Sequence, residues 1–275
     1  MINILNKSNF VFKDQLNKYE GKVRDVYTLN NNILVMIASD RISAFDVIMP
    51  KGITYKGQIL NQIAVEMLNK TSDIVPNWLI SNPDPNVSIG KKCNPIKVEM
   101  VVRGYLSGHA FREYNSGKRE ICGNKIQNGL KENDKFKFPI ITPTTKADQG
   151  LHDQDINPTD IIKQKLLSKE DYDKIYEISL SLYKRGSEIA NKQGLILVDT
   201  KYEFGYDQNG TITLIDEIHT PDSSRYFYFD SYEELQEKGL KQKQLSKEFF
   251  REWLMLNNFR GLQNQLIPEI NEDVI

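Results

Sequence analysis

The sequence has few cysteines and no long hydrophobic run. Its 275 residues include two cysteines, Cys93 and Cys122, which are too few for a disulfide scaffold, and we expect both to be reduced and structural. No apolar stretch approaches the roughly 20 residues that a membrane-spanning helix needs. The first residues show no secretory signal pattern. These absences favour a cytoplasmic protein that does not bind membranes.

An excess of charge of either sign is also missing. Lys and Arg number 36 and Asp and Glu number 37, which gives a formal net charge of −1. Such a chain has no long-range attraction for nucleic acid or for an anionic membrane. It also lacks a basic stripe with interleaved aromatic residues, which is typical of nucleic-acid-binding modules. We therefore expect small-molecule substrates as partners, not nucleic acid or membranes. The sequence leaves open whether the protein is a monomer or a homodimer.

The remaining composition is that of an ordinary globular protein, with 39% hydrophobic and 27% charged residues. Hydrophobic patterns predict strands over 19–29, 32–40, 94–106, 195–206 and 211–218, and a loop over 81–86. They predict helices over 57–73, from Ser168 to Gly194, and twice in the tail after Tyr232. Because most strands fall in hairpins, the pattern favours an α+β fold with antiparallel sheets.

The segment 198–205, "VDTKYEFG", places three charges on alternate positions of a strand that follows the oily run "LILV". Asp199, Lys201 and Glu203 would therefore share one face. A solvated edge strand is the simplest interpretation. The alternative is a site that holds ions and phosphate.

The Asn209–Gly210 dipeptide is typical of a two-residue type I′ hairpin turn. With that turn, Glu203 faces Asp216 across the hairpin. Carboxylates opposite each other, with Cβ atoms about 5 Å apart, repel unless a cation such as Mg²⁺ lies between them. Lys201, about 6.6 Å along the strand, would then reach a phosphate. A four-residue loop would instead pair Lys201 with Asp216 in a plain salt bridge, so both interpretations stay open.

Other charged clusters follow predicted strands or occupy glycine-containing turns. Glycine lets the backbone approach a phosphate, and arginine binds phosphate bidentately. Each cluster alone is weak evidence, but together they supply many phosphate-binding cations and metal-binding carboxylates. The candidates are Gly21, Lys22, Asp40, Arg41, Asp46, Arg103, Lys146, Asp148, His152 and Arg225.

Five motifs in the same order closely resemble the phosphoribosylaminoimidazole-succinocarboxamide (SAICAR) synthase family. They are "YEGKVRDVY", "SDRISAFD", "VEMVVRGYLSG", "LVDTKYEFG" and "DEIHTPDSSR", and the resemblance runs from about residue 19 to about residue 255. It implies an ATP-dependent ligase that uses Mg²⁺ and joins L-aspartate to the carboxylate of carboxyaminoimidazole ribonucleotide (CAIR). The alternative is another small-molecule phosphotransferase on the same scaffold, which would turn over without an amine acceptor.

The resemblance implies two intimate lobes related to ATP-grasp enzymes: a nucleotide-binding lobe over 1–103, and a lobe over 104–275 that binds substrate and metal and carries the terminal helices. Gly21 and Lys22 would lie over the ATP phosphates, and Glu99 would lie on the strand that leads to the adenine pocket. Glu203 and Asp216 would hold Mg²⁺.

The resemblance also implies the substrate-binding and catalytic residues. Arg103 and Arg225 would grip the phosphate of the ribonucleotide, and Asp40 would meet its imidazole amine or carboxylate. Lys201 would contact phosphate near the reacting centre. Lys146 and Asp148 match a segment beside the substrate, and Asp148 and His152 are the candidate general bases.

One position departs from the family pattern. Many members read "GYLTGS", where the serine helps to bind the sugar phosphate, whereas this chain reads "GYLSGHAF" and has His109 at that place. A histidine can still donate a hydrogen bond to a phosphate. We therefore expect His109 to bind substrate in a phosphate pocket of different shape.

Overall fold

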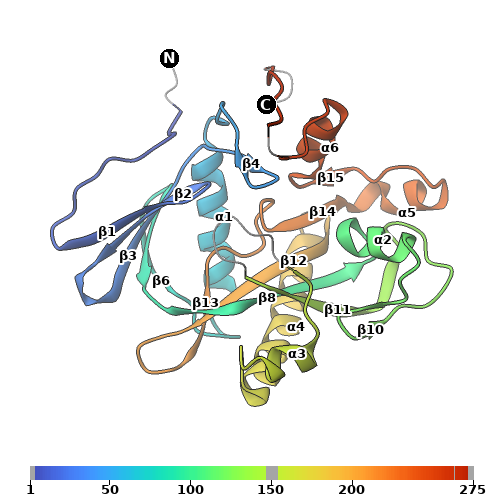
Figure 1. Cartoon of the computed structure of the whole chain (residues 1–275), viewed down its shortest axis with the longest axis horizontal. Helices are drawn as coiled ribbons and strands as arrows, with labels where there is room; N and C mark the ends of the chain where they lie inside the picture. The colour runs from blue at the N-terminus through green and yellow to red at the C-terminus, as the bar shows by residue number, and fades with distance from the viewer. Residues whose placement is uncertain (1–3, 147–153, 263, 272–275) are drawn as a thin grey trace. The chain divides into compact units, whose positions relative to one another are not determined.

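The computed structural model describes residues 4–146, 154–262 and 264–271, and contacts divide the chain into two compact units. The first unit comprises residues 1–68, 78–92 and 246–275. The second comprises residues 69–77 and 93–245. Both are built on antiparallel sheets with helices, so the predicted α+β class is confirmed (Figure 1).

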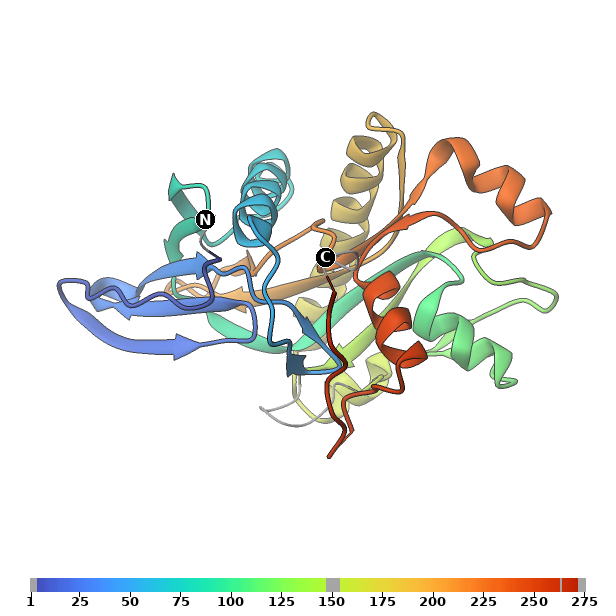
Figure 2. The same cartoon turned by 90° about the horizontal axis from the view of Figure 1, so that it is seen from above.

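The first unit is built on a five-stranded antiparallel sheet in the order β1-β2-β3-β7-β6. Its strands are β1 (Gln15–Glu20), β2 (Arg24–Leu29), β3 (Ile33–Ala38), β6 (Leu79–Asp84) and β7 (Val87–Lys91). The 3₁₀ turn η1 (Asn30–Asn32) joins β2 to β3, between the strands predicted over 19–29 and 32–40. Helix α1 (Lys56–Lys70) lies on one side of this sheet (Figure 2). Ser88 of β7 donates a 2.8 Å hydrogen bond to the side chain of Asn61 on α1.

The loop predicted over 81–86 is wrong, because β6 includes residues 81–84 and pairs with β7. The two prolines argued for a loop, since proline cannot donate to a strand ladder. β6 is, however, the edge strand of its sheet and its register with β7 is irregular. An edge strand tolerates Pro83 because only one side of the strand needs hydrogen bonds.

The two units do not follow the expected division after residue 103. That position lies inside β8 (Asn94–Tyr105), an unbroken strand of the second unit. The C-terminal helix α6 (Glu248–Leu256) belongs to the first unit. Its Phe250 and Leu254 are buried with Ile42 and Met49, beside the short hairpin of β4 (Ser43–Ala44) and β5 (Val47–Ile48). Hydrophobic burial thus draws the tail back to the N-terminal part of the chain.

The second unit is built on a six-stranded antiparallel sheet with β11-β8-β12-β14-β15 in line and β13 paired to β12. Besides β8, its strands are β11 (Lys135–Thr145), β12 (Leu195–Tyr206), β13 (Ile212–Ile215), β14 (Ser224–Tyr228) and β15 (Gln244–Leu245). The two long strands β8 and β12 run side by side (Figure 1). A separate small hairpin consists of β9 (Glu120–Ile121) and β10 (Asn124–Lys125).

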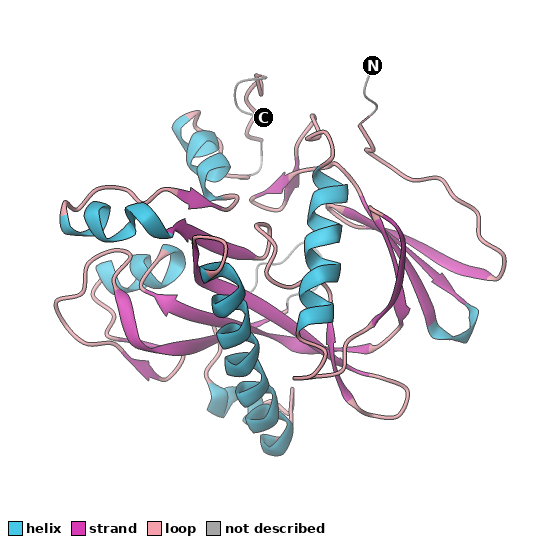
Figure 3. Ribbon diagram, turned by 180° about the vertical axis from the view of Figure 1, so that it is seen from behind, coloured by secondary structure: helices cyan, strands magenta, loops and turns pink. Residues whose placement is uncertain are grey.

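Helices α2 (Gly108–Asn115), α3 (Pro158–Lys163), α4 (Lys169–Asn191) and α5 (Phe229–Glu237) complete the second unit. Ser168 caps α4 as predicted, since its side chain accepts a hydrogen bond from the Asp171 amide at 3.0 Å. Helix α4 covers one face of the six-stranded sheet (Figure 3). Its Tyr183 hydroxyl donates to the Leu197 carbonyl at 2.6 Å. A Cβ at Gly104 would lie 2.0 Å from that hydroxyl, so this close approach needs glycine.

Within the described residues, no helix combines the length and apolar character that crossing a membrane would need.

Candidate active site

The three alternating charges lie on β12, which is an inner strand. β12 pairs with β8 on one side and with β14 and β13 on the other. Asp199 and Glu203 are 9% and 5% exposed, while the Lys201 side chain is about one-third exposed. The solvated-edge interpretation is therefore wrong, and the buried charges need partners within the protein.

The predicted pairing of Glu203 with Asp216 is also wrong, because the hairpin loop has three residues, 208–210, and Glu203 faces Ile215. A type I′ turn needs positive φ at both central residues, but only Gly210, at φ 75°, has it. The Asp207 carboxylate accepts the amides of Asn209 and Thr211 at 2.9 and 2.8 Å. These bonds favour the three-residue loop with a left-handed glycine.

The four-residue alternative is wrong as well. Asp216 lies just beyond the end of β13 in the left-handed region, at φ 61°, and the register of β12 with β13 does not place it opposite Lys201.

Two facing carboxylates do exist, but they are Glu99 and Glu203, on β8 and β12. Lys201 Nζ lies 3.1 Å from Glu99 Oε1 and 2.5 Å from Glu203 Oε1. Lys146, just after β11, forms an ion pair with the other oxygen of Glu203. Two ammonium groups thus offset the repulsion that the pairing creates.

These groups hold one another in their charged forms. Burial would raise the pKa of Glu203, but Lys201 and Lys146 outweigh it and hold that pKa well below its usual range. Burial would lower the pKa of Lys201, yet Glu203, Glu99 and Asp216 raise it above the ordinary lysine value. The pKa of Lys146 is raised against burial in the same way, mainly by Glu203 and also by Asp216.

Further along the same face, Asp199 lies between two arginines on the neighbouring strands. It pairs with Arg103 of β8 and with Arg225 of β14. Asp199 Oδ2 lies 3.2 Å from an Arg103 terminal nitrogen and 3.8 Å from one of Arg225. Arg103 Nε also donates to Thr142 Oγ1 at 2.9 Å. Burial lowers the Arg103 pKa, and Asp199 partly offsets this effect.

Arg225 packs against the start of α2. A Cβ at Gly108 would lie 2.5 Å from an Arg225 terminal nitrogen, and Gly108 has a φ of 56°. Glycine therefore allows both the turn and the close approach of the guanidinium. We call the side of the six-stranded sheet that carries these charges the charged face. It comprises Glu99, Arg103, Lys146, Asp199, Lys201, Glu203, Asp216 and Arg225.

His109, the second residue of α2, binds a carboxylate. Its Nε2 lies 2.8 Å from Asp155 Oδ2, and this bond is the main reason why the pKa of Asp155 is lowered. Within the described part of the chain, His109, Glu113 and Asp155 are the one group of three possible metal ligands with ligand atoms all within 4.8 Å. Lys118 already forms an ion pair with Glu113.

In the first unit, Gly21 and Lys22 form the tight turn between β1 and β2. The Gly21 amide donates to the Arg24 carbonyl at 2.8 Å. Arg41 donates to the carbonyls of Gly21 and Lys22 at 2.9 and 3.2 Å, and to Asp25 at 2.8 Å. The buried Asp25 carboxylate therefore anchors an arginine that holds the turn. Lys22 forms an ion pair with Asp46.

Asp40 is buried in the first unit with both carboxylate oxygens engaged. It accepts the Leu5 amide at 2.9 Å and the Gly57 amide, near the start of α1, at 3.0 Å. This arrangement stabilises the helix start. The predicted bases Asp148 and His152 lie outside the described residues.

Sequence reasoning gave no role to Asp199 and missed the pairing of Glu99 with Glu203. The available signal was that residues 99 and 103 share one face of β8, as residues 199 and 203 share one face of β12. Register between these strands is set by contacts far apart in sequence. Thr142 and Asp155 carried no sequence signal.

Comparisons with known proteins identify the family of the chain. The family model described as SAICAR synthetase matches residues 17–266. The chain belongs to the SAICAR synthetase family. Phosphoribosylaminoimidazole-succinocarboxamide synthase of Flavobacterium psychrophilum is 58% identical over 274 residues, 100% of this chain and 87% of that protein. The Bacteroides thetaiotaomicron protein of the same name is 59% identical over 271 residues, 98% of this chain and 86% of that protein.

Solved structures of SAICAR synthases resemble the fold. One is the Saccharomyces cerevisiae SAICAR synthase complexed with SAICAR, with a TM-score of 0.77 and 31% identity over 94% of this chain and 89% of that chain. Another is a SAICAR synthetase in complex with ADP, with a TM-score of 0.71 and 26% identity over 92% of this chain and all of that chain.

Membership of the SAICAR synthetase family assigns the reaction. The protein is an ATP-dependent carbon–nitrogen ligase of purine biosynthesis, which joins L-aspartate to the carboxylate of CAIR. It therefore binds a nucleotide and small-molecule substrates. The predicted activity is confirmed, and the alternative of a simple phosphotransferase is set aside.

Proposed function

We propose that the charged face of the six-stranded sheet performs phosphoryl transfer in this ligase. The observation that carries the proposal is Lys201, whose ammonium group lies between the facing carboxylates of Glu99 and Glu203. Buried, mutually charged groups of both signs are unusual away from functional sites. Lys146 and Asp216 extend the same electrostatic cluster.

The reaction explains why such a cluster is useful. A carboxylate is a poor acyl donor because oxide is a poor leaving group. An oxygen of the CAIR carboxylate therefore attacks the γ-phosphorus of ATP and ADP leaves, which gives an acyl phosphate. The aspartate amine then attacks the acyl carbon, phosphate leaves, and the amine loses a proton. Lys201 and Lys146 would neutralise the charge that moves onto phosphate oxygens.

We propose that Glu203 and Asp216 hold Mg²⁺. Their donor chemistry fits, because carboxylate oxygens are the protein ligands that Mg²⁺ prefers beside substrate phosphates. Both Glu203 oxygens contact the ammonium groups of Lys201 and Lys146, so Mg²⁺ would replace one of these cations at the carboxylate. Bound there, the ion would act as a Lewis acid toward phosphate oxygens.

Arg103 and Arg225, which lie together on the charged face, are proposed to bind the ribonucleotide phosphate. Arg103 and Arg225 both reach Asp199, so a phosphate that approaches them meets two guanidinium groups held in position. His109, at the start of α2 beside Gly108, would add a third donor. This replacement of the family's serine gives the pocket a longer side chain anchored by Asp155.

The remaining assignments rest on the family resemblance. Gly21 and Lys22 are proposed to lie over the ATP phosphates in a turn held by Arg41, and Glu99 to lie on the strand that leads to the adenine pocket. Asp40 is proposed to meet the imidazole substituents, although backbone amides already engage both its oxygens. Lys146 and Asp148 are proposed to lie beside the substrate, with Asp148 as the candidate base.

Metal binding tests the carboxylate assignment separately from turnover. Mn²⁺, added with ADP to the intact protein, is followed by electron paramagnetic resonance in the wild type, Glu203→Gln and Asp216→Asn. We expect both variants to bind Mn²⁺·ADP at least about tenfold more weakly. Glu237→Gln, at the exposed end of α5, is the matched control. Equal Mn²⁺ affinity in all four proteins would overturn the ligand assignment and leave the family activity unaffected.

A further inference from the structure

A cavity lies on the α4 side of the six-stranded sheet, away from the charged face. Its volume is about 840 Å³, and residues of β8, β11, β12, α4 and α5 line it. Gly104 and Leu197 form part of the wall, beneath the Tyr183 ring of α4. The volume is within the range of pockets that bind small molecules.

The cavity exists because β11 leaves the register of β8. Lys135 pairs with Tyr105, but the next paired residue is Ile140, which faces Arg103. Residues 136–139 therefore bulge out of the ladder with β8. The bulge leaves a space between β11 and helices α4 and α5. The Phe138 side chain, 69% exposed, lies in this bulge.

The walls combine aromatic rings with a few polar groups. Tyr105 and Tyr232 pack edge-to-face with ring centroids 5.5 Å apart, and both line the cavity with Ile196. Ser187 and Asn191 of α4 add a hydroxyl and an amide. Such walls suit a flat, largely apolar molecule that carries a polar group.

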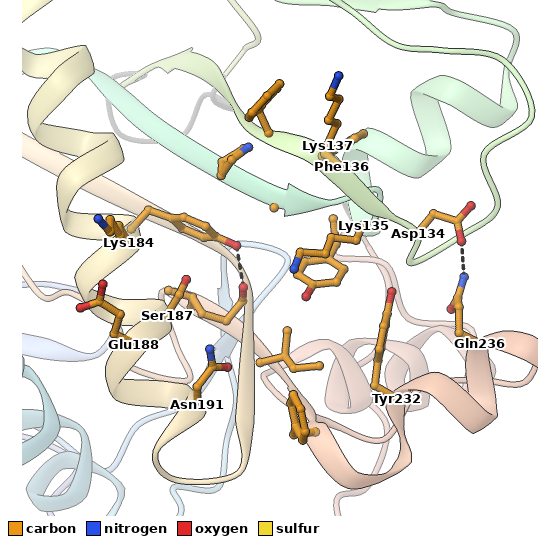
Figure 4. A pocket seen from close by; sticks show the side chains of 18 of the residues that line it. Asp134, Lys135, Phe136, Lys137, Lys184, Ser187, Glu188, Asn191, Tyr232 and Gln236 are labelled. Carbon is orange, nitrogen blue, oxygen red and sulfur yellow. Dashed lines mark hydrogen bonds between the residues drawn. The ribbon is translucent and has the colours of Figure 1, made fainter.

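The directions of the charged side chains decide which polar group fits. Lys135 points into the cavity, whereas Lys137 and Glu188 point away from it (Figure 4). Asp134 is turned toward Gln236, whose amide nitrogen donates to it at 2.6 Å (Figure 4). Lys184 and Glu233 also line the cavity, and the ammonium group that Figure 4 shows pointing into it is that of Lys135.

We propose that this cavity is a second ligand site, separate from the charged face, for an aromatic anion such as an aryl carboxylate or sulfonate. The rings and Ile196 hold the aromatic body, and Lys135 binds the anionic group, with Asn191 and Ser187 as additional donors. The proposal goes beyond the ligase reaction and does not depend on the roles assigned to the charged face.

The probe for the test is 8-anilinonaphthalene-1-sulfonate, titrated into the full chain by fluorescence with saturating Mg-ATP and CAIR present. We expect one molecule per chain. Lys135→Met should raise its Kd about tenfold by removing a charge-assisted contact. Lys137→Met, a lysine on the same strand that points away, should leave Kd unchanged. Asn191→Trp, at an exposed position on α4 that lines the cavity, should narrow the cavity and raise Kd.

Three results would overturn the proposal. One is an equal Kd in Lys135→Met and Lys137→Met. Another is an unchanged Kd in Asn191→Trp with native circular dichroism. The third is probe binding that falls as the protein concentration rises, in step with dimer formation in sedimentation, because a second copy of the chain would then cover the cavity.

Discussion

Glu99 and Glu203 face each other across the two central strands of the second unit, and the ammonium group of Lys201 contacts both. Like charges in such a position destabilise a sheet unless a cation lies between them. Lys201 therefore supplies positive charge between them, at the position where we propose that phosphoryl transfer needs it. Removing that lysine should affect both stability and activity.

Lys201→Met should lower the free energy of unfolding by about 2 kcal/mol, less than a fully buried pair would lose because Lys201 is partly exposed. Adding Glu99→Gln to this variant should recover part of the loss, since one of the two facing charges is gone. Urea denaturation of the wild type, both single variants and the double variant gives the coupling. Additive losses would mean that Lys201 does not offset the carboxylate repulsion.

Glu203→Gln and Asp216→Asn should each lower kcat at least about 100-fold with little change in fold, if both carboxylates act on phosphoryl transfer. Steady-state ADP release at saturating substrates and Mg²⁺ measures the effect, with circular dichroism as the check on folding. Glu237→Gln serves again as the control and should keep wild-type kcat. Retained activity in either site variant at saturating Mg²⁺ would refute its role.

Asp199→Asn should destabilise the substrate-free protein, because the buried Arg103 and the partly buried Arg225 lose their shared carboxylate. A bound phosphate group would replace the missing negative charge. CAIR should therefore raise the melting temperature more in Asp199→Asn than in the wild type. An equal or smaller rise in the variant, at CAIR concentrations that saturate both proteins, would argue against phosphate binding at Arg103 and Arg225.

His109→Ala should raise KM for CAIR more than KM for ATP, because His109 follows Gly108, which Arg225 approaches closely at the start of α2. Asp155→Asn, which removes the partner of His109, should change KM for CAIR in the same direction but less. The measurement is initial velocity with each substrate varied in turn. An unchanged KM for CAIR in His109→Ala would show that His109 does not bind the substrate phosphate.

The burial of His219 predicts that the protein loses stability as the pH falls. The residue is fully buried beside Tyr202, with Nε2 2.6 Å from the hydroxyl, and burial lowers its pKa from 6.5 to about 3. Between these values the unfolded chain binds a proton that the folded protein does not, so stability falls as pH drops from 6.5 toward 3. His219→Asn should be less stable at pH 7 but lose less further stability across that window.

Urea midpoints measured from pH 7 to pH 4 in the wild type and in His219→Asn check this expectation. The carboxylates contribute equally to the pH dependence of stability in both proteins, so the difference between the two curves isolates the effect of His219. Parallel curves would mean that His219 is not held neutral in the folded state.

The strands and helices were predictable where the pattern was local. The strand over 195–206 and the Ser168 cap of α4 follow from residues close in sequence. The register of the hairpin between β12 and β13 was not predictable from local sequence. The Asp207 carboxylate selects a three-residue loop over the type I′ turn that Asn209–Gly210 favours. A shift of one residue changes every facing pair.

The candidate site was predictable in composition but not in its pairings. Alternation on β12 correctly indicated a shared charged side, yet the carboxylate that faces Glu203 comes from β8, about 100 residues earlier in the chain. Likewise, the division into units depends on burial of Phe250 and Leu254 against N-terminal residues, which no linker composition signals.

The central claim is that this protein activates CAIR with ATP and then joins it to L-aspartate. Its most direct test is ADP release from the purified protein with Mg-ATP and CAIR, measured with and without L-aspartate. The reaction proposed for the charged face predicts sustained ADP release only when all three substrates are present. Sustained ADP release at the same rate without aspartate would contradict the claim, because the acyl phosphate would then not await an amine acceptor.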